Sequence, residues 1–272
     1  MNLPVVLSIA GSDNSAGAGA QADLKTMSAL GVYGTTAITC VVAEVPGKVS
    51  AIQPVEPAIV AEQIRLIFDA WPVAAVKTGM LFSRAIISAV ADTLGECLAR
   101  EPRRPALVVD PVMVATSGDP LLREDAVALY KERIFPLAAL VTPNMDEVRV
   151  LLGTPRPPGS VGELRDAGRE LATRHQCAFL IKGGHLPGAV ATDLLVTPAG
   201  EVTEYTAPFV PGVNTHGTGC TTSAAIAAAL ARGLSLHDAV GEAKKYVHKA
   251  IAGFLRWEKN GRVTDALHHF AP

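Results

Sequence analysis

The sequence lacks the excess of one charge that general affinity for nucleic acid or for a membrane surface requires. Its 24 Lys and Arg stand against 26 Asp and Glu, for a formal net charge of -2, and charged residues make up only 18%. Such a balance provides no broad attraction to nucleic acid or to anionic lipid. We therefore expect neither as a partner, and any anion must be recognised locally.

Cysteine is scarce and is not spaced for metal binding or crosslinking. Cys40, Cys97, Cys177 and Cys220 show no C-x-x-C pattern, which favours a reducing cytoplasm over secretion and makes a zinc site unexpected. Residues 1–4 carry no basic segment, and the apolar run after them is too short for a signal sequence or a membrane span. We expect a cytoplasmic protein.

Two common nucleotide-binding motifs are missing or incomplete. The chain has no G-x-x-x-x-G-K-[ST], which excludes a P-loop. Gly17-x-Gly19-x-x-Ala22 formally matches a dinucleotide fingerprint, but it lies too far from the preceding strand, and no acidic residue is well placed at the end of a second strand. This glycine pattern is therefore weak support for a dinucleotide cofactor.

The chain does contain a repeated alternation of buried strand, polar turn and helix. Apolar β-branched runs predict strands, and apolar residues at helical spacing predict helices. Strands are predicted at 5–10, 35–42, 49–55, 74–77, 106–109, 140–141 and 178–181, a hairpin at 193–205, and helices at 20–30, 57–70, 85–100 and 236–257. This order predicts a mostly parallel sheet with helices on both faces, in a single domain over residues 1–272.

Residues 214–221 join a small-residue turn to the start of another helix, which stops at Gly233. Free N–H groups and the positive end of the helix dipole bind anions at such a start, and Gly217 and Gly219 let the backbone approach closely. The same dipole is expected to lower the pKa of the Cys220 thiol, which would make it a base or a nucleophile. A helix cap with an inert buried cysteine is the alternative.

Polar side chains follow several of the predicted strands. Asp110, Asn144 and Lys182 each come after a strand, and Glu44 is expected just past the end of strand 35–42. Ligands of parallel sheets bind at this carboxyl edge, and these groups suit phosphates and magnesium, so the pattern suggests phosphoryl transfer. The structural alternatives are a turn cap for Asp110 and a helix N-cap for Asn144, with Glu147 completing a capping box.

Several ordered motifs together carry a resemblance to a known family. They are Ala10-Gly11-Ser12-Asp13 with residues 17–25, Asp110-Pro111-Val112-Met113 with 117–120, Thr142-Pro143-Asn144, Lys182-Gly183-Gly184-His185, and 214–221. Over essentially the whole chain they resemble the bacterial hydroxymethylpyrimidine/phosphomethylpyrimidine kinases of thiamine biosynthesis. The resemblance implies a ribokinase-like three-layer αβα sandwich with a small β-hairpin addition, and commonly a homodimer.

The activity that the resemblance implies is ATP-dependent phosphorylation of 4-amino-5-hydroxymethyl-2-methylpyrimidine, first to the monophosphate and then to the diphosphate. Cys220 would take the proton from the acceptor hydroxyl. The backbone N–H groups of Gly217, Thr218 and Gly219 would hold the transferring phosphoryl group. ATP and Mg²⁺ are the implied cofactors, bound by Asp110, Asn144, Glu147, Lys182 and Thr215, with Glu147 and Asp110 on the metal, in part through water.

The substituted aminopyrimidine would lie among residues from several loops, namely Gly11, Ala18, Asp23, Glu44, Met80 and Val112. Relatives carry Gln or Met at the position of Glu44, and an ionised glutamate can accept from the 4-amino group but cannot donate to a ring nitrogen. Protonation of Glu44, of Asp23 or of the ring, or a different ligand, would each resolve this. Thr116 is a second departure, since many relatives have lysine there.

Two other functions remain open at the level of sequence. Some relatives with the same cysteine motif phosphorylate B6 vitamers, so a pyridoxal or pyridoxine kinase is one alternative. A non-catalytic small-molecule binding protein on the same fold is the other. Segments 183–188 and 116–122 are the candidate loops over the ligand, and His268-His269 is expected to be a solvated tail.

Overall fold

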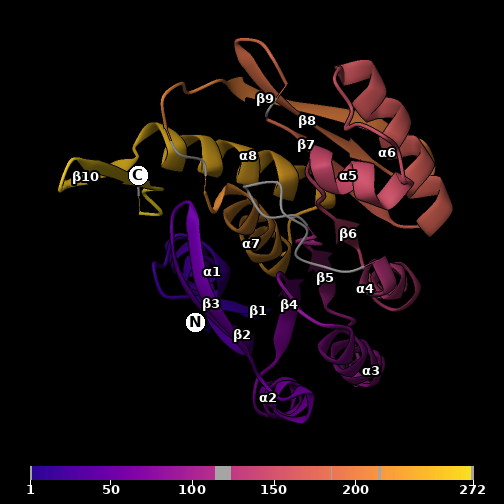
Figure 1. Ribbon diagram of the computed structural model, residues 1–272. Coiled ribbons are helices and arrows are strands. Elements are labelled where there is room, and N and C mark those ends of the chain that lie inside the picture. The colour runs from indigo at the N-terminus through magenta and orange to yellow at the C-terminus, as the bar shows by residue number, and fades with distance from the viewer. Residues whose placement is uncertain (1, 114–123, 185, 214–215, 271–272) are drawn as a thin grey trace.

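The computed structural model describes residues 2–113, 124–184, 186–213 and 216–270, in which nine strands form one sheet between two layers of helices (Figure 1). Their order is β3-β2-β1-β4-β5-β6-β7-β8-β9. The neighbours from β2 to β7 are parallel, whereas β3 at one edge and β8 and β9 at the other are antiparallel. The predicted parallel sheet with helices on both faces and the predicted hairpin are confirmed.

The elements follow one another with short connections. The sheet contains β1 Val5–Asp13, β2 Tyr33–Val45, β3 Lys48–Pro54, β4 Val73–Thr78, β5 Ala106–Val109, β6 Leu140–Val141, β7 Ala178–Gly183, β8 Val190–Val196 and β9 Val202–Pro208. The helices are α1 Gly19–Ala29, α2 Pro57–Ala70, α3 Arg84–Arg100, α4 Glu124–Leu129, α5 Met145–Leu152, α6 Val161–His175, α7 Thr218–Ala231 and α8 Leu236–Ala252.

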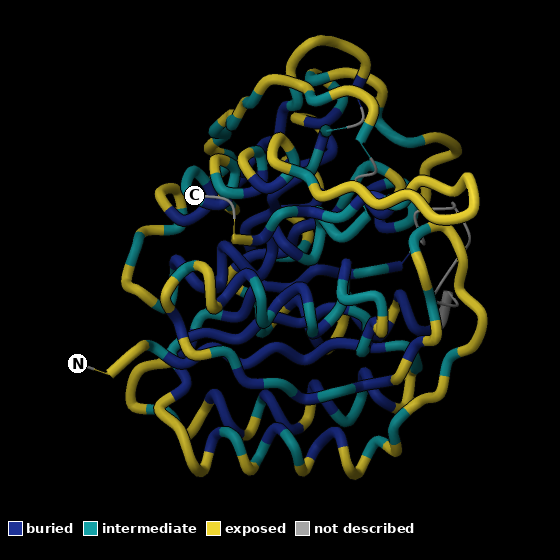
Figure 2. The backbone as a smooth tube through the Cα atoms, turned by 90° about the vertical axis from the view of Figure 1, so that its left-hand side faces the viewer, coloured by how far each residue is buried: buried dark blue, intermediate teal, exposed yellow. Residues whose placement is uncertain are grey.

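Each face of the sheet has its own apolar core. Residues of α2 to α6 pack on one face, and residues of α1, α7 and α8 pack on the other. Figure 2 shows the strands buried between helices whose turns alternate between buried and exposed positions. Helix α7 is buried over most of its length and is built mainly from alanine and other small residues, so its backbone approaches the strands closely.

Strand alternation determines which polar residues lie under α7. Apolar residues of β1, β4, β5, β6 and β7 face this helix layer, namely Val6, Ala75, Val108, Leu140 and Leu180. Because successive side chains of a strand alternate between faces, the residue two positions later faces the same layer. These positions carry Ser8, Lys77, Asp110, Thr142 and Lys182. The carboxyl end of this face is therefore a polar row, whereas the rest of the face is apolar.

The end of the chain differs from the sequence prediction. Helix α8 ends at Ala252 instead of residue 257, and β10 Leu255–Lys259 pairs with β11 Arg262–Ala266 in a separate two-stranded sheet. The turn between them is Asn260-Gly261, and both residues have positive φ. Asn-Gly is the sequence most typical of a two-residue hairpin turn, because both central residues of that turn need positive φ. The Asn260-Gly261 pair is therefore the feature of the sequence that indicates the β10–β11 hairpin.

The prediction of a solvated histidine tail is wrong for His269. Its side chain is only 3% exposed, and its Nε2 lies 3.2 Å from Thr221 Oγ1 in the first turn of α7. Tyr246 donates to the backbone oxygen of His269 at 2.6 Å. Burial lowers the pKa of His269 to about 4. The end of the chain thus packs against the start of α7, which no local pattern indicates.

Candidate active site

Helix α7 begins directly against the loop that follows β1. Its N-cap, Gly217, has a φ of +86°, and a Cβ there would lie 1.8 Å from the backbone oxygen of Gly17. No other residue can occupy this position without moving one of the two segments. The predicted small-residue turn is therefore a close backbone crossing, and it places the N-terminal end of α7 at the carboxyl edge of the sheet.

A lysine and a carboxylate meet at this helix start. Lys182 Nζ donates to Asp110 Oδ1 at 3.1 Å, and a Cβ on Gly219 would lie 3.3 Å from Lys182 Nζ and 3.6 Å from Asp110 Oδ2. Ser223 Oγ of α7 lies 3.4 Å from Asp110 Oδ2. Burial lowers the pKa of Lys182, but the charges of Asp110 and Glu147 raise it. The net shift of this pKa is upward. The lysine is therefore charged beside the start of α7.

Asn144 and Glu147 form the capping box that the sequence offered as an alternative. Asn144 Oδ1 accepts from Glu147 N at 2.9 Å, and Glu147 Oε2 accepts from Asn144 N at 2.8 Å. Glu147 Oε1 also accepts from the backbone N–H of Met113 at 3.1 Å. Burial raises the pKa of Glu147 to about 7, against the opposing effect of Lys182. This capping role does not exclude a role toward a ligand.

The carboxylates of Asp110 and Glu147 are suited to a magnesium ion held partly through water. Both residues are nearly fully buried, and each raises the electrostatic cost of the other's charge, since Asp110 is one of the causes that raise the pKa of Glu147. A divalent cation would reduce that cost, and carboxylate oxygens that accept one N–H keep a further lone pair. The described residues contain no cluster of three or more metal-binding side chains.

Cys220 lies in the first turn of α7, but its environment differs from the sequence prediction. The residue is half-buried, and burial raises the pKa of its thiol to about 11, although Lys77 and the backbone N–H of Gly19 lower it. The predicted lowering by the helix dipole is thus wrong for the free protein. Loss of water around the thiolate is the largest cause of this increase.

Asp23, a predicted acceptor-binding residue, lies inside the protein. Its side chain is 0% exposed, and its carboxylate receives hydrogen bonds from Lys77 Nζ at 2.8 and 3.0 Å and from Ser8 Oγ. Both oxygens are engaged within a buried ion pair. This placement does not favour direct contact between Asp23 and an acceptor. Lys77 is a buried charged residue that the sequence analysis did not select.

Glu44 lies within β2 and not past its end, so that expectation is wrong. It pairs with Val49 of β3 at a register shift, and Asn14 Oδ1 accepts its backbone N–H at 2.6 Å. The Glu44 carboxyl shares its surroundings with Asp13 and His216. Burial and the charge of Asp13 raise the pKa of Glu44, while His216 lowers it. The Asp13 carboxylate, 3.7 Å from His216 Nε2, and the charge of Glu44 raise the pKa of His216.

Of the remaining predicted acceptor residues, Gly11, Ala18 and Met80 lie around the end of β1, and Val112 follows β5. Met80 Sδ lies 3.9 Å, and Cys40 Sγ 2.9 Å, from the position of a Cβ on Gly11, so the glycine makes room between them. Ala18 donates its N–H to Asp13 at 2.8 Å, and Val112 is half-buried with a φ of +35°. Thr215, Thr116, His185 and loop 116–122 lie outside the described residues.

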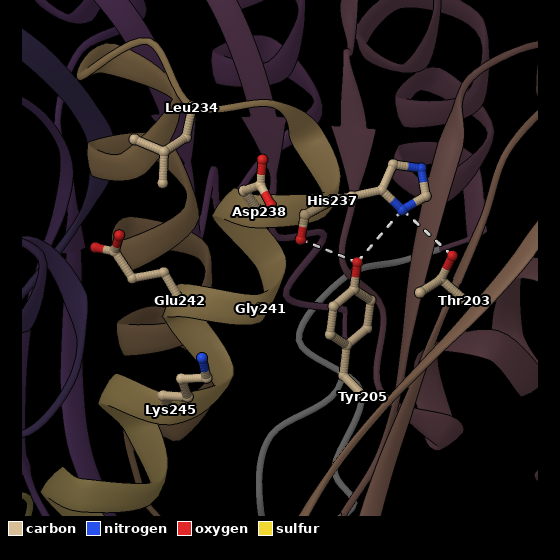
Figure 3. Close-up of a pocket in the computed structure, with 8 residues that line it drawn as sticks. All are labelled: Thr203, Tyr205, Leu234, His237, Asp238, Gly241, Glu242 and Lys245. Carbon is tan, nitrogen blue, oxygen red and sulfur yellow. Dashed lines mark hydrogen bonds between the residues drawn. The ribbon is translucent and has the colours of Figure 1, made fainter.

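A separate hollow lies between β9 and the first half of α8 (Figure 3). Tyr205 of β9 donates to the backbone oxygen of His237 at 3.0 Å across this hollow. The remaining lining residues are Thr203, Leu234, Asp238, Gly241, Glu242 and Lys245. None of the predicted site residues lines it. The predicted residues gather instead at the carboxyl edge of the sheet.

A charged lysine, buried carboxylates and a glycine-rich helix start at the edge of this sheet are suited to phosphoryl transfer to a small molecule. Comparison with known proteins agrees and narrows the class. The phosphomethylpyrimidine kinase family model matches residues 13–264. The chain is 46% identical, over 98% of its length and 97% of the relative, to the hydroxymethylpyrimidine/phosphomethylpyrimidine kinase of Rhizobium meliloti. The chain belongs to the phosphomethylpyrimidine kinase family.

Solved structures support the same fold. A Bacillus subtilis pyridoxal kinase in complex with ADP superposes with a TM-score of 0.88 at 32% identity, covering 99% of this chain and 98% of that one. A phosphomethylpyrimidine kinase from Clostridium difficile superposes with a TM-score of 0.77 at 37% identity, covering 91% and 99%. The ribokinase-like αβα sandwich is therefore confirmed, and the protein is a kinase.

Proposed function

We propose that the protein transfers the terminal phosphoryl group of ATP to the hydroxymethyl group of 4-amino-5-hydroxymethyl-2-methylpyrimidine, and then phosphorylates the monophosphate. The observation that carries this proposal is the Lys182–Asp110 pair held against Gly219, at the helix start that contains Cys220. Family membership identifies the acceptor class. The product is an intermediate of thiamine biosynthesis.

The residues divide the reaction between charge stabilisation and proton transfer. Backbone N–H groups of Gly217, Thr218 and Gly219 hold the phosphoryl oxygens as charge develops, and Lys182 and Asn144 bind the nucleotide phosphates. Cys220 takes the proton of the acceptor hydroxyl. Thr215 is proposed on the nucleotide side as well. Mg²⁺ neutralises phosphate charge when bound, and Glu147 and Asp110 are the residues that would hold it.

The acceptor side consists of Glu44 with Gly11, Ala18, Met80 and Val112. Glu44 is placed to accept from the 4-amino group, and His216 is the nearby group that compensates its charge. Asp23 has an indirect role and does not contact the acceptor, because its two carboxylate oxygens are hydrogen-bonded to Lys77 and Ser8.

Further parts of the proposal concern the whole protein. We expect one kinase domain, a homodimer in the cytoplasm, and no nucleic-acid or membrane partner. In the described part of the chain, no helix is both long enough and apolar enough to span a membrane.

The decisive test compares acceptors with purified protein and saturating Mg-ATP. The expected result is a higher kcat/KM for the hydroxymethylpyrimidine than for pyridoxal, followed by conversion of the monophosphate to the diphosphate. A pyridoxal kinase is the second candidate, because a pyridoxal kinase structure superposes over nearly the whole chain. Faster turnover of pyridoxal would establish that candidate instead. Binding of the pyrimidine without any phosphoryl transfer would show a non-catalytic protein.

A further inference from the structure

A completely buried ion pair lies behind the first turn of α7. Lys77 of β4 and Asp23 of α1 are both 0% exposed at their side chains, and Lys77 Nζ contacts both carboxylate oxygens. A buried pair of charges is costly to desolvate and contributes little net stability compared with apolar side chains of the same volume. Stability of the fold therefore does not explain its presence.

The position of the pair connects it to Cys220. Lys77 faces the α7 layer, and α7 packs on both β4 and α1. A Cβ on Gly79 would lie 2.9 Å from Lys77 Nζ. Gly79 directly precedes Met80 of the proposed acceptor pocket. The pair thus lies in the layer on which α7 packs, next to the residue that precedes Met80.

The charges around the thiol identify Lys77 as the main opposing cation. Burial raises the pKa of Cys220, Lys77 lowers it most, and Asp23 and Asp110 raise it. Lys182 also interacts with Cys220, and like Lys77 it is paired with a carboxylate, that of Asp110. These groups come from β4, α1, the segment after β5, and β7; His269 of the C-terminal segment also contacts the first turn of α7, through Thr221.

We propose that Lys77 and Asp23 are positioning residues for Cys220: the Lys77 ammonium is the counter-charge of the Cys220 thiolate, and Asp23 holds that ammonium in place. This rests on the proposed role of Cys220 as base. In that step the acceptor O–H bond breaks as the S–H bond forms, and the acceptor oxygen bonds to phosphorus as the bridging P–O bond of ATP breaks. The ammonium favours the thiolate before the transfer, and Asp23 moderates this effect.

Substitutions of Lys77 and of Asp23 should change the thiolate fraction of Cys220 in opposite directions, whereas a purely structural role of the pair predicts no such difference. Loss of the positive charge in Lys77→Met should disfavour the thiolate, whereas Asp23→Asn leaves the ammonium to pair with the sulfur and should favour it. The measurement is the rate of Cys220 alkylation by iodoacetamide between pH 7 and 9.5, followed by intact mass. The other cysteines are buried, and Cys220→Ala gives their background rate.

We expect alkylation about threefold or more slower in Lys77→Met and faster by a similar factor in Asp23→Asn, because thiolate fraction changes more than nucleophilicity. Lys244→Met is the matched control, since Lys244 forms another largely buried pair with Asp193, at 2.7 Å; it should match wild type. Equal rates in all proteins, or a change in the same direction in both variants, would overturn the proposal.

Two controls distinguish an effect on alkylation from effects on folding and on catalysis. Circular dichroism checks each variant, and if Lys77→Met does not fold, Asp23→Asn alone decides: faster alkylation supports the proposal and slower or unchanged alkylation overturns it. The alkylation assay needs neither ATP nor acceptor. If Cys220→Ala keeps full kinase activity, the base role fails while the electrostatic link between Lys77 and the thiol is still measured.

Discussion

At Cys220, burial and the helix start act on the same thiol in opposite directions. The site needs a proton acceptor, yet burial raises the pKa of this thiol to about 11. The proposed base therefore depends on the positive groups around it, of which Lys77 is the strongest. The sequence motif around Cys220 is thus not enough to predict the pKa of the thiol, because that pKa also depends on charged groups that the fold brings close to it.

Replacement of Cys220 by alanine should lower kcat by about 100-fold or more, the usual contribution of a general base, with little change in acceptor binding. Steady-state kinetics and acceptor titration measure the two effects. Cys177→Ala is the control, because Cys177 is buried and burial raises the pKa of its thiol to about 12; its kcat should not change. Full activity in Cys220→Ala would favour the helix-cap alternative.

Glu44→Gln should keep pyrimidine activity and change its pH dependence. Because burial and Asp13 raise the pKa of Glu44, the wild-type carboxyl gains its proton at a higher pH than an exposed glutamate, and the charged acceptor for the 4-amino group is lost as pH falls through that pKa. The variant lacks this titration, and its His216 loses one of the anions that raise its pKa. Profiles of kcat/KM between pH 5 and 8 test this. Identical profiles would show that ionisation of Glu44 does not determine the pH dependence of kcat/KM.

Among the elements, α7 depends on a close crossing with the loop after β1. The side chain of Asp13 holds that loop, accepting from the N–H groups of Ser15 at 2.6 Å and Ala18 at 2.8 Å. Although burial raises the pKa of Asp13, the nearby His216 and the hydrogen bonds from this loop lower it to about 2. The anion-binding helix start is therefore built from two segments far apart in the sequence.

Gly217→Ala should be much more harmful than Gly233→Ala. Both glycines have a left-handed φ, of +86° and +90°, but a Cβ at Gly217 would lie 1.8 Å from Gly17 O, whereas a Cβ at Gly233 meets nothing within 4 Å. The control carries only the backbone strain of about 1–2 kcal/mol. Denaturant unfolding and kinase assays measure the difference, and we expect loss of activity only in Gly217→Ala. Equal effects would show that the crossing can relax.

For the whole molecule, the nucleotide should stabilise the fold through the sheet edge. A ligand that binds only the native state raises the unfolding free energy, by about 2.7 kcal/mol at a hundred times its Kd. We expect Mg-ADP to raise the Tm of the wild type and to have a much smaller effect on Lys182→Met. Thermal unfolding with and without Mg-ADP measures this. Lys245→Met is the control, since Lys245 lines the hollow in Figure 3; loss of the shift there would place the nucleotide in that hollow.

Local patterns in the sequence were enough for the strands of the large sheet, for several helices and for one piece of site geometry, whereas α4 and α6 were not predicted. The strands from 5–10 to 178–181 were predicted from apolar runs, and the Asn144–Glu147 capping box from its spacing. These features depend on neighbours a few residues away. The C-terminal hairpin could have been found in the same way, from Asn260-Gly261.

The sequence by itself determined the mostly parallel sheet, the polar groups at its carboxyl edge and the glycine turn before α7. Only the tertiary structure decided the pairing of Lys77 with Asp23, the burial of His269 and the raised pKa of Cys220. The physical reason is that periodicity and capping are properties of adjacent residues. Desolvation and ion pairing depend on groups from several elements, here 54 residues apart for Lys77 and Asp23.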